Sequence, residues 1–272
     1  MIKQKDVKVL IENNKIYNHD AKDFIHMLYE DYGDNSINMF FCDFPYTFKG
    51  KQRVTANKWD LPIDDKDFFD VAMRLLTEDG VICLTASQPF TSYLVYNHLD
   101  CFKYEWVIEK DNGSNFMHVK HQPFKVHESV LIFGKSPTTY NKNEKYMKYN
   151  PQMTVGKAYK VNRKGMTDNL ATSSNYERTS GEYGEERYPR SVLKFNWEKG
   201  LHPTQKPVDL VKYMINTYTD EGATVVDVCC GSGTTAIASI LTNRKFIVND
   251  IEEKYYEIAK NRIEETLKNQ GL

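Results

Sequence analysis

The sequence predicts an α/β fold built around a sheet of buried strands. Short apolar runs alternate along the chain with segments whose apolar residues recur at helical spacing. Successive positions of each run are apolar, which is typical of strands in a parallel sheet that is covered on both faces. The length of 272 residues and the hydrophobic content of 40% suit one domain with a sizeable core and an insertion.

The expected elements follow this alternation. Strands are expected at residues 37–42, 81–85, 106–109, 129–133, 224–228 and 245–248. Helices are expected at residues 64–76, 90–98, 207–218, 234–241 and 254–267, with one more after a turn at residues 18–20. A proline precedes the helix at 90–98, and Pro207 suits the first turn of its own helix.

One segment, residues 135–198, breaks the pattern. It is rich in Asn, Ser, Thr, Lys, Arg and Tyr and shows no sustained periodicity, so we expect an insertion there. The chain would then divide into residues 1–134, the insertion at 135–198, and residues 199–272, with the first and last parts forming one domain.

Charge and hydropathy exclude several classes of protein. With 36 basic and 37 acidic residues the net charge is −1, so a nucleic-acid site would have to be a local patch. No apolar run approaches the roughly 20 residues of a membrane span, and the N-terminus lacks the apolar core of a signal peptide. We expect a cytoplasmic protein without a membrane association, whose five cysteines are reduced.

A glycine-rich turn lies between a strand that ends at Asp227 and the helix expected at 234–241. Gly231 and Gly233 leave room for a ligand over the turn, because a Cβ would collide with it, and the helix N-terminus favours polar or anionic groups. Asp250 ends the next strand, about 20 residues after the first glycine, which is the spacing at which an acid reaches a ribose hydroxyl. The sequence therefore predicts a ribose-bearing cofactor.

A nicotinamide cofactor is the alternative at this point. Gly231, Gly233 and Ala236 satisfy the G-x-G-x-x-A pattern of dinucleotide folds. Such a fold usually begins its domain with this unit, whereas here the unit lies near the end of the chain. The position disfavours a dehydrogenase.

A second informative stretch runs from an apolar strand into Asp43, Phe44, Pro45 and Tyr46. These four residues resemble the D-P-P-Y catalytic motif of the DNA amino-methyltransferases, and residues 227–234 resemble the S-adenosylmethionine motif of that family. Residues 202–207 resemble the segment that precedes the cofactor motif. The order, with the catalytic motif first and the cofactor motif last, is similar to that of the β class. Phe44 in place of the first proline is the clear departure.

The resemblance implies a Rossmann-like S-adenosylmethionine-dependent methyltransferase fold, with a mixed, mostly parallel sheet, helices on both faces and a target-recognition insertion. It implies methyl transfer to the N6 amine of a flipped adenine in double-stranded DNA, as in restriction-modification systems. Adenine is favoured because many N4-cytosine relatives carry Ser where Asp43 stands. N4-cytosine methylation stays open, as does a DNA- and cofactor-binding protein impaired by Phe44. Cytosine-C5 chemistry is disfavoured, because no Pro is followed by Cys.

In this family the catalytic residues would act on an amine whose lone pair is delocalised into the base. The resemblance assigns the two hydrogen-bond acceptors to the Asp43 carboxylate and the Phe44 carbonyl, which act best when preorganised. Tyr46 would stack on the flipped base, and Pro45 would stiffen the corner. The cofactor would lie against Asp20, Pro203, Thr204, Lys206, Asp227, Cys229, Gly231, Gly233, Thr234, Thr235 and Asp250. Asp20 could equally be an ordinary N-cap, and Lys206 a solvated lysine.

The insertion is the candidate for DNA recognition. Residues 135–164 contain eight Lys or Arg residues against one acid, Glu144, with tyrosines interleaved, as phosphate and base contacts require. We expect phosphate contacts from Lys142, Lys145, Lys148, Lys157 and Arg163. A solvated loop and an RNA substrate are the alternatives.

Residues 110–115 and the His and Lys residues after them are also expected to line the DNA cleft. His118 and His121 have the H-x-x-H spacing, but no H-E-x-x-H pattern or thiolate cluster accompanies them, so no metal is expected. The resemblance leaves a homodimer as an option.

Overall fold

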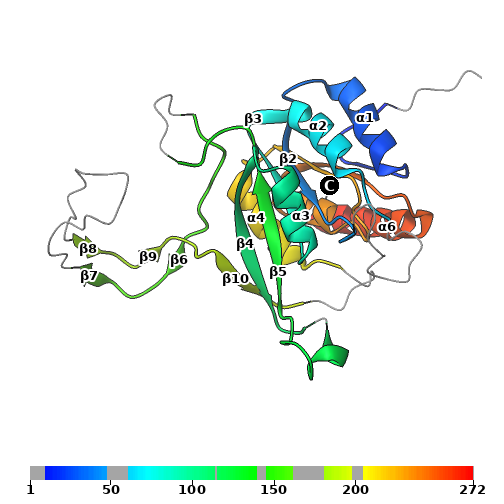
Figure 1. Cartoon of the computed structure of the whole chain (residues 1–272). Helices are drawn as coiled ribbons and strands as arrows, with labels where there is room; N and C mark the ends of the chain where they lie inside the picture. The colour runs from blue at the N-terminus through cyan, green and yellow to red at the C-terminus, as the bar shows by residue number, and fades with distance from the viewer. Residues whose placement is uncertain are drawn as a thin grey trace, which may run out of the picture. The chain divides into compact units, whose positions relative to one another are not determined.

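The computed structural model describes residues 10–47, 61–113, 115–139, 145–161, 181–197 and 205–271 (Figure 1). The chain divides into two compact units: Met1–Asn150 with Ser191–Leu272, and Pro151–Arg190. The boundaries 1–134, 135–198 and 199–272 stay a prediction. Within the described ranges, none of the helices is both long and apolar enough to cross a membrane.

The larger unit is built on a mixed sheet with the strand order β1-β12-β11-β2-β3-β5-β4-β10. Neighbouring strands are parallel, except that β5 is antiparallel to both β3 and β4. The mostly parallel sheet that the sequence predicted is thereby confirmed. The strands are β1 (Lys15–Tyr17), β2 (Ile37–Cys42), β3 (Leu76–Ala86), β4 (Phe102–Lys110), β5 (His127–Phe133), β10 (Val192–Phe195), β11 (Thr224–Asp227) and β12 (Lys245–Asn249).

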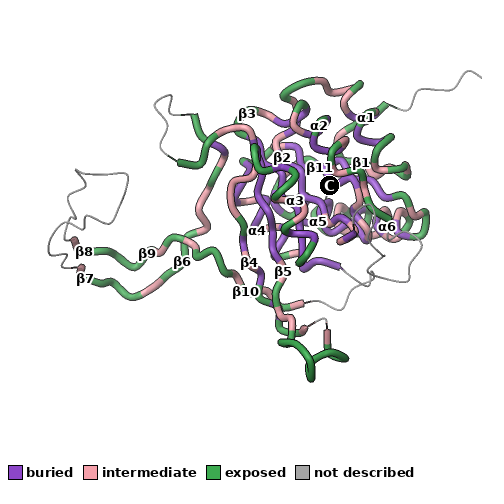
Figure 2. The backbone as a smooth tube through the Cα atoms, viewed as in Figure 1, coloured by how far each residue is buried: buried purple, intermediate pink, exposed green. Residues whose placement is uncertain are grey.

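Helices cover both faces of this sheet. They are α1 (Ala21–Tyr32), α2 (Asp65–Leu75), α3 (Phe90–Asn97), α4 (Val208–Tyr218), α5 (Thr234–Leu241) and α6 (Glu253–Gln270). The side chains of β2 alternate between two cores, with Phe40 and Cys42 packing among α1, α2 and α3 and Met39 and Phe41 packing against α4. Figure 2 shows the central strands almost continuously buried, which explains their apolar sequences.

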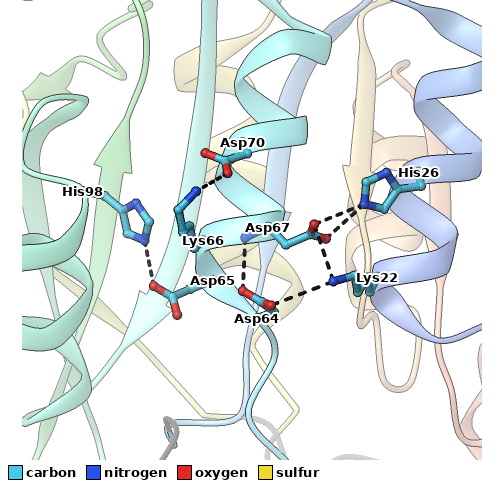
Figure 3. A network of polar contacts seen from close by, with 8 residues as sticks. All are labelled: Lys22, His26, Asp64, Asp65, Lys66, Asp67, Asp70 and His98. Carbon is cyan, nitrogen blue, oxygen red and sulfur yellow. Dashed lines mark hydrogen bonds and ion pairs between the residues drawn. The ribbon is translucent and has the colours of Figure 1, made fainter.

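A polar network holds α2 against its neighbours (Figure 3). Asp67 of α2 lies 3.1 Å from Nε2 of His26 and 3.6 Å from Nζ of Lys22, both on α1. On the other side of α2, the Asp65 carboxylate lies 2.8 Å from Nε2 of the buried His98, just after α3. The exposed contacts to α1 contribute little individually. The three helices on this face are thus joined by polar contacts as well as by their shared core.

The carboxyl ends of β11, β2, β3 and β4 all lie on the same side of the sheet, the side where these strands end, because the four strands run in the same direction. From β11 the chain passes through α5 to β12 on one side, and from β2 it passes through α2 to β3 on the other. The direction of winding therefore reverses between β11 and β2. Ligands of open α/β sheets bind at such a switch point.

Several short strands were not predicted. β1 has only three residues, and β10 is a partly exposed strand at the sheet edge. β10 falls inside the predicted insertion, yet it pairs with β4 in the central sheet. The smaller unit contains two antiparallel pairs, β6 (Thr154–Val155) with β9 (Glu186–Arg187) and β7 (Tyr159–Val161) with β8 (Gly181–Tyr183).

Candidate active site

The end of β2 presents the Asp43 carboxylate at the switch point. The Thr85 hydroxyl, from β3, donates a hydrogen bond to its Oδ1. Nζ of Lys206 donates to its Oδ2 over 2.7 Å. Lys206 lies just before α4 and is 7% exposed. An acid at a strand end is therefore fixed by two side chains that lie far from it in the sequence.

Glu128 on β5 extends this contact into a network of two buried lysines and two partly buried carboxylates. Its carboxylate accepts hydrogen bonds from Nζ of Lys110 over 2.7 Å and from the Tyr46 hydroxyl over 3.2 Å. Nζ of Lys206 lies 3.4 Å from the same carboxylate. Two lysines and two carboxylates thus balance in formal charge. We call Asp43, Tyr46, Lys110, Glu128 and Lys206 the catalytic corner.

The pKa shifts follow from this arrangement. Burial by itself raises the pKa of Glu128, but the charges of Lys206 and Lys110 outweigh it and lower the pKa to about 2. Burial lowers the pKa of Lys206, but the surrounding negative charges, Asp43 foremost, raise it well above its ordinary value. Both groups therefore stay ionised across the physiological range.

The two aromatic residues of the motif have different surroundings. Phe44 is buried, and its ring meets that of Phe68 on α2 edge-on, with the ring centroids 4.9 Å apart. Tyr46 stacks on Phe90 with centroids 5.9 Å apart, and Lys206 Nζ lies 5.5 Å from the Tyr46 ring centroid. Burial, together with the charge of Asp43, raises the pKa of the Tyr46 phenol well above its ordinary value. The phenol therefore remains a hydrogen-bond donor to Glu128.

The glycine-rich turn after β11 is shaped by left-handed backbone. Gly231 has φ of 53° and Gly233 has φ of 81°. A Cβ on Gly233 would lie 2.9 Å from the Cβ of Ala259 on α6, so glycine is required there by helix packing as well as by conformation. The Gly231 N–H donates to Oδ2 of Asp250 over 2.8 Å, which joins the turn to the end of β12.

Two buried carboxylates organise this cofactor turn, which we define as residues 227–235 with Asp250. Asp227 accepts hydrogen bonds from the Thr235 hydroxyl over 2.6 Å and from the Cys229 N–H over 3.1 Å. Burial raises the pKa of Asp227 to about 7 and that of Asp250 to about 6, although the hydrogen bonds that each carboxylate accepts lower its pKa. Thr234 and Thr235 are themselves buried. Asp227 and Thr235 therefore brace the turn.

The catalytic corner and the cofactor turn touch each other. Sγ of the half-buried Cys229 lies 3.6 Å from the carbonyl oxygen of Asp43. The Ser232 hydroxyl donates to Oε1 of Gln205 over 2.9 Å, which connects the turn to the residue beside Lys206. Three motifs that are separated in the sequence thus form one site at the switch point.

A scan against protein families matches residues 37–261 to the DNA methylase family of N6-adenine and N4-cytosine enzymes. The chain belongs to this family. It is 25% identical to the type II methyltransferase M2.MboI of Moraxella bovis, across 93% of this chain and 89% of that one. It is 26% identical to the DNA adenine methyltransferase YhdJ of Escherichia coli, across 84% of this chain and 76% of that one.

Among solved structures, the crystal structure of the M1.HpyAVI–S-adenosylmethionine complex superposes with a TM-score of 0.57 and 21% identity, covering 91% of this chain and 98% of that one. This likeness confirms the fold. The protein is an S-adenosylmethionine-dependent DNA methyltransferase.

The cofactor turn of this methyltransferase suits its cofactor. The carboxylate of Asp250 lies at the end of β12, where a ribose would meet it, and the two glycines leave the turn without side chains. Asp20 caps α1, because its carboxylate accepts a hydrogen bond from the Lys22 N–H over 2.9 Å. Nearby in the sequence, the side-chain amide of Asn18 donates to the backbone carbonyl of Asp250. Pro203 and Thr204 lie outside the described residues. The cofactor roles of these residues stay a prediction.

The expected DNA contacts are only partly described. Nζ of Lys148 pairs with Asp220 over 2.5 Å, and the Lys148 N–H donates to the Asp79 carbonyl, so this lysine is bonded within the larger unit, to which it belongs. Lys157 lies in the smaller unit, where its carbonyl accepts a hydrogen bond from Arg187. Lys145 is described, whereas Lys142 and Arg163 lie outside the described residues. Within the described part of the chain, no group of three or more His, Cys, Asp or Glu residues could hold a metal ion.

Two residues of the catalytic corner, Lys110 and Glu128, and Thr85 beside it have roles that were missed in the sequence. Thr85, Lys110 and Glu128 come from β3, β4 and β5 and meet only because those strands are neighbours in the sheet. A charged residue at each end of the loop between β4 and β5 was the available signal, because charges in otherwise apolar strands need partners.

Proposed function

We propose that this methyltransferase modifies the N6 amine of adenine in a short sequence of double-stranded DNA. The observation that carries the proposal is the position of Asp43 at the end of β2. Lys206 holds its carboxylate, and its backbone carbonyl contacts Cys229 of the cofactor turn. The match to a relative named as a DNA adenine methyltransferase supports adenine as the target.

In this proposal the Asp43 carboxylate and the Phe44 carbonyl accept hydrogen bonds from the two N–H groups of the target amine. These bonds draw the nitrogen out of conjugation with the ring and direct its lone pair towards the cofactor. When bound, S-adenosylmethionine supplies a methyl group activated by its sulfonium. The nitrogen gains the methyl and gives up one proton, which Asp43 is placed to accept.

The contacts of Asp43 are compatible with this role. A carboxylate offers about four acceptor positions. Thr85 and Lys206 use one on each oxygen, so acceptor capacity remains for the amine. Lys206 also fixes the orientation of the carboxylate, and preorganised acceptors need no rearrangement during the reaction.

Tyr46 is proposed to stack on the extruded base, with its hydroxyl fixed by Glu128. On the cofactor side, Asp250 is proposed to bind the ribose, with Gly231 and Gly233 beside the ligand. Sequence recognition is proposed for the insertion at residues 135–198, which includes the smaller unit, Pro151–Arg190. We also infer a cytoplasmic location, and a homodimer stays a prediction.

Nucleoside mass spectrometry tests the proposal. Unmodified genomic DNA is incubated with the protein and isotopically labelled S-adenosylmethionine, digested to nucleosides and analysed. We expect labelled N6-methyl-2′-deoxyadenosine, and none with an Asp43→Ala control. Labelled N4-methyl-2′-deoxycytidine would refute the adenine assignment. A protein that binds the cofactor but labels no base would refute the proposed function, and recovery of labelling in a Phe44→Pro variant would then identify Phe44 as the disabling residue.

A further inference from the structure

The loop that joins β4 to β5 begins and ends in the catalytic corner. Lys110 is the last residue of β4 and Glu128 is the second residue of β5, and the two pair over 2.7 Å. Because β4 ends at the same edge of the sheet as β2, the loop leaves the molecule on the side of Asp43. Figure 1 shows it extending beyond the ends of β4 and β5.

The outer part of this loop, residues 116–124, exposes large apolar side chains, and we call it the tip. Phe116 is 76% exposed and Met117 is 89% exposed, in a short 3-10 turn. Val119 and Phe124 are also exposed. Figure 2 shows the same stretch as exposed. A cluster of exposed apolar side chains marks an interaction site more often than chance.

The tip has a defined shape. The Asn115 side chain closes its base, donating to the Pro123 carbonyl over 2.9 Å and accepting the Lys125 N–H over 2.8 Å. The His121 N–H donates to the His118 carbonyl over 2.9 Å. These bonds fix the backbone that carries the apolar side chains, so less conformational entropy is lost when a partner binds.

The positive charge of the loop at residues 112–127 indicates an anionic partner. Residues 112–127 contain Lys120 and Lys125, three histidines and no acid. Cations beside protruding apolar side chains suit DNA, because the cations can contact phosphates and the apolar side chains can insert between base pairs.

We propose that the tip enters the DNA duplex beside the target base, with Phe116 and Met117 as the wedge. The inference rests on the proposed function, because it supposes that an adenine leaves the helix to reach Asp43. A base that leaves its stack costs unpairing and unstacking energy. The wedge offsets that cost by filling the opened step with apolar surface.

The experiment compares a Phe116→Ala/Met117→Ala variant with a matched control, Tyr96→Ala/Leu99→Ala. The control residues are 84% and 66% exposed. They precede the amino end of β4, whereas the tip follows its carboxyl end. Single-turnover methyl transfer is measured on a duplex that carries the methylation site located by modified-base sequencing. A second duplex lacks the base opposite the target adenine. Calorimetry with S-adenosylmethionine checks that each variant is folded.

We expect the tip variant to lose about tenfold to a hundredfold in rate on the paired duplex, the range of one base–aromatic contact. On the duplex with the unpaired adenine the loss should shrink to about threefold or less, because little opening work remains. The control variant should match the wild type on both. The inference is overturned if the tip variant methylates the paired duplex as fast as the wild type does. It is also overturned if the variant loses the same factor in rate on both duplexes.

An inactive wild type would refute the proposed function and leave the wedge to be judged by duplex affinity. Fluorescence anisotropy with a random-sequence duplex then decides. A loss of affinity confined to the tip variant supports the wedge, and unchanged affinity overturns it.

Discussion

The catalytic corner and the cofactor turn are both built on buried carboxylates, but they neutralise them differently. In the corner, Glu128 faces two lysines, and its pKa is lowered to about 2. In the turn, Asp227 and Asp250 accept hydrogen bonds from backbone N–H groups and a threonine hydroxyl, and their pKa values rise to about 7 and about 6. Cationic partners keep a buried acid charged, whereas these neutral donors do not fully offset burial.

The two regions should therefore respond to acid in opposite directions. The lowered pKa of Glu128 contributes stability above its ordinary value of 4.5, and this contribution is lost as the pH falls towards about 2. The raised pKa values of Asp227 and Asp250 contribute stability below their ordinary 3.8, and it is lost as the pH rises through about 6 to 7. The Glu128 carboxylate thus stays ionised at neutral pH, whereas the two carboxylates of the cofactor turn titrate close to neutrality.

Replacement of Lys206, which pairs with both carboxylates of the catalytic corner, should have the largest effect on stability. Lys206→Met leaves the partly buried carboxylates of Asp43 and Glu128 with one counter-charge fewer. Removal of one partner from a buried ion pair costs up to about 3–5 kcal/mol. Lys148→Met is the matched control, because it breaks an exposed pair with Asp220 and should cost about 1 kcal/mol or less. Urea unfolding measures both free energies. Equal losses in the two variants would contradict the idea that the corner depends on its cations.

Phe44→Pro should have a somewhat smaller effect. The family's usual proline would preserve the backbone carbonyl, and the residue before Pro45 is already biased towards extended backbone. It would also remove a buried ring from Phe68, so we expect a loss of about 2–4 kcal/mol in the free energy of unfolding.

The same Phe44→Pro variant should keep the modified base, and its single-turnover rate should be retained or raised. A Phe44→Leu variant controls for packing alone. If the wild type were inert and the Phe44→Pro variant active, Phe44 would be a disabling residue.

The smallest predicted effect is the pH dependence of cofactor affinity. In the proposed binding mode, ribose hydroxyls donate to the ionised form of Asp250, so affinity for S-adenosylmethionine should fall up to about tenfold per pH unit below about 6. Asp250→Asn should bind more weakly with a flatter profile, and Asp227→Asn separates the contribution of the neighbouring acid. Calorimetric titrations between pH 5 and 8, a span of about three units, give the profiles. A wild-type profile that is flat below pH 6 would contradict the raised pKa.

Local sequence carried much of the fold and the position of the site. The bounds of β2 and α5 match the prediction, because apolar runs and glycine-rich turns determine such elements locally. β10 was missed because an edge strand of four residues, half-exposed, carries no continuous apolar run. The pairing of Lys206 with Asp43 could not be predicted either, because the two residues lie far apart in the sequence and meet only in the folded sheet.

The central claim is that Asp43 serves the chemistry and Asp250 serves the cofactor. The most direct test measures S-adenosylmethionine affinity by calorimetry and single-turnover methyl transfer, both on Asp43→Ala and on Asp250→Ala. Asp43→Ala should lose about a thousandfold or more in transfer and bind the cofactor nearly as the wild type does. Asp250→Ala should lose about tenfold or more in cofactor affinity, the value of a hydrogen bond to a charged group, and recover transfer at saturating cofactor. Loss of cofactor binding by Asp43→Ala as severe as that of Asp250→Ala would contradict this division of roles.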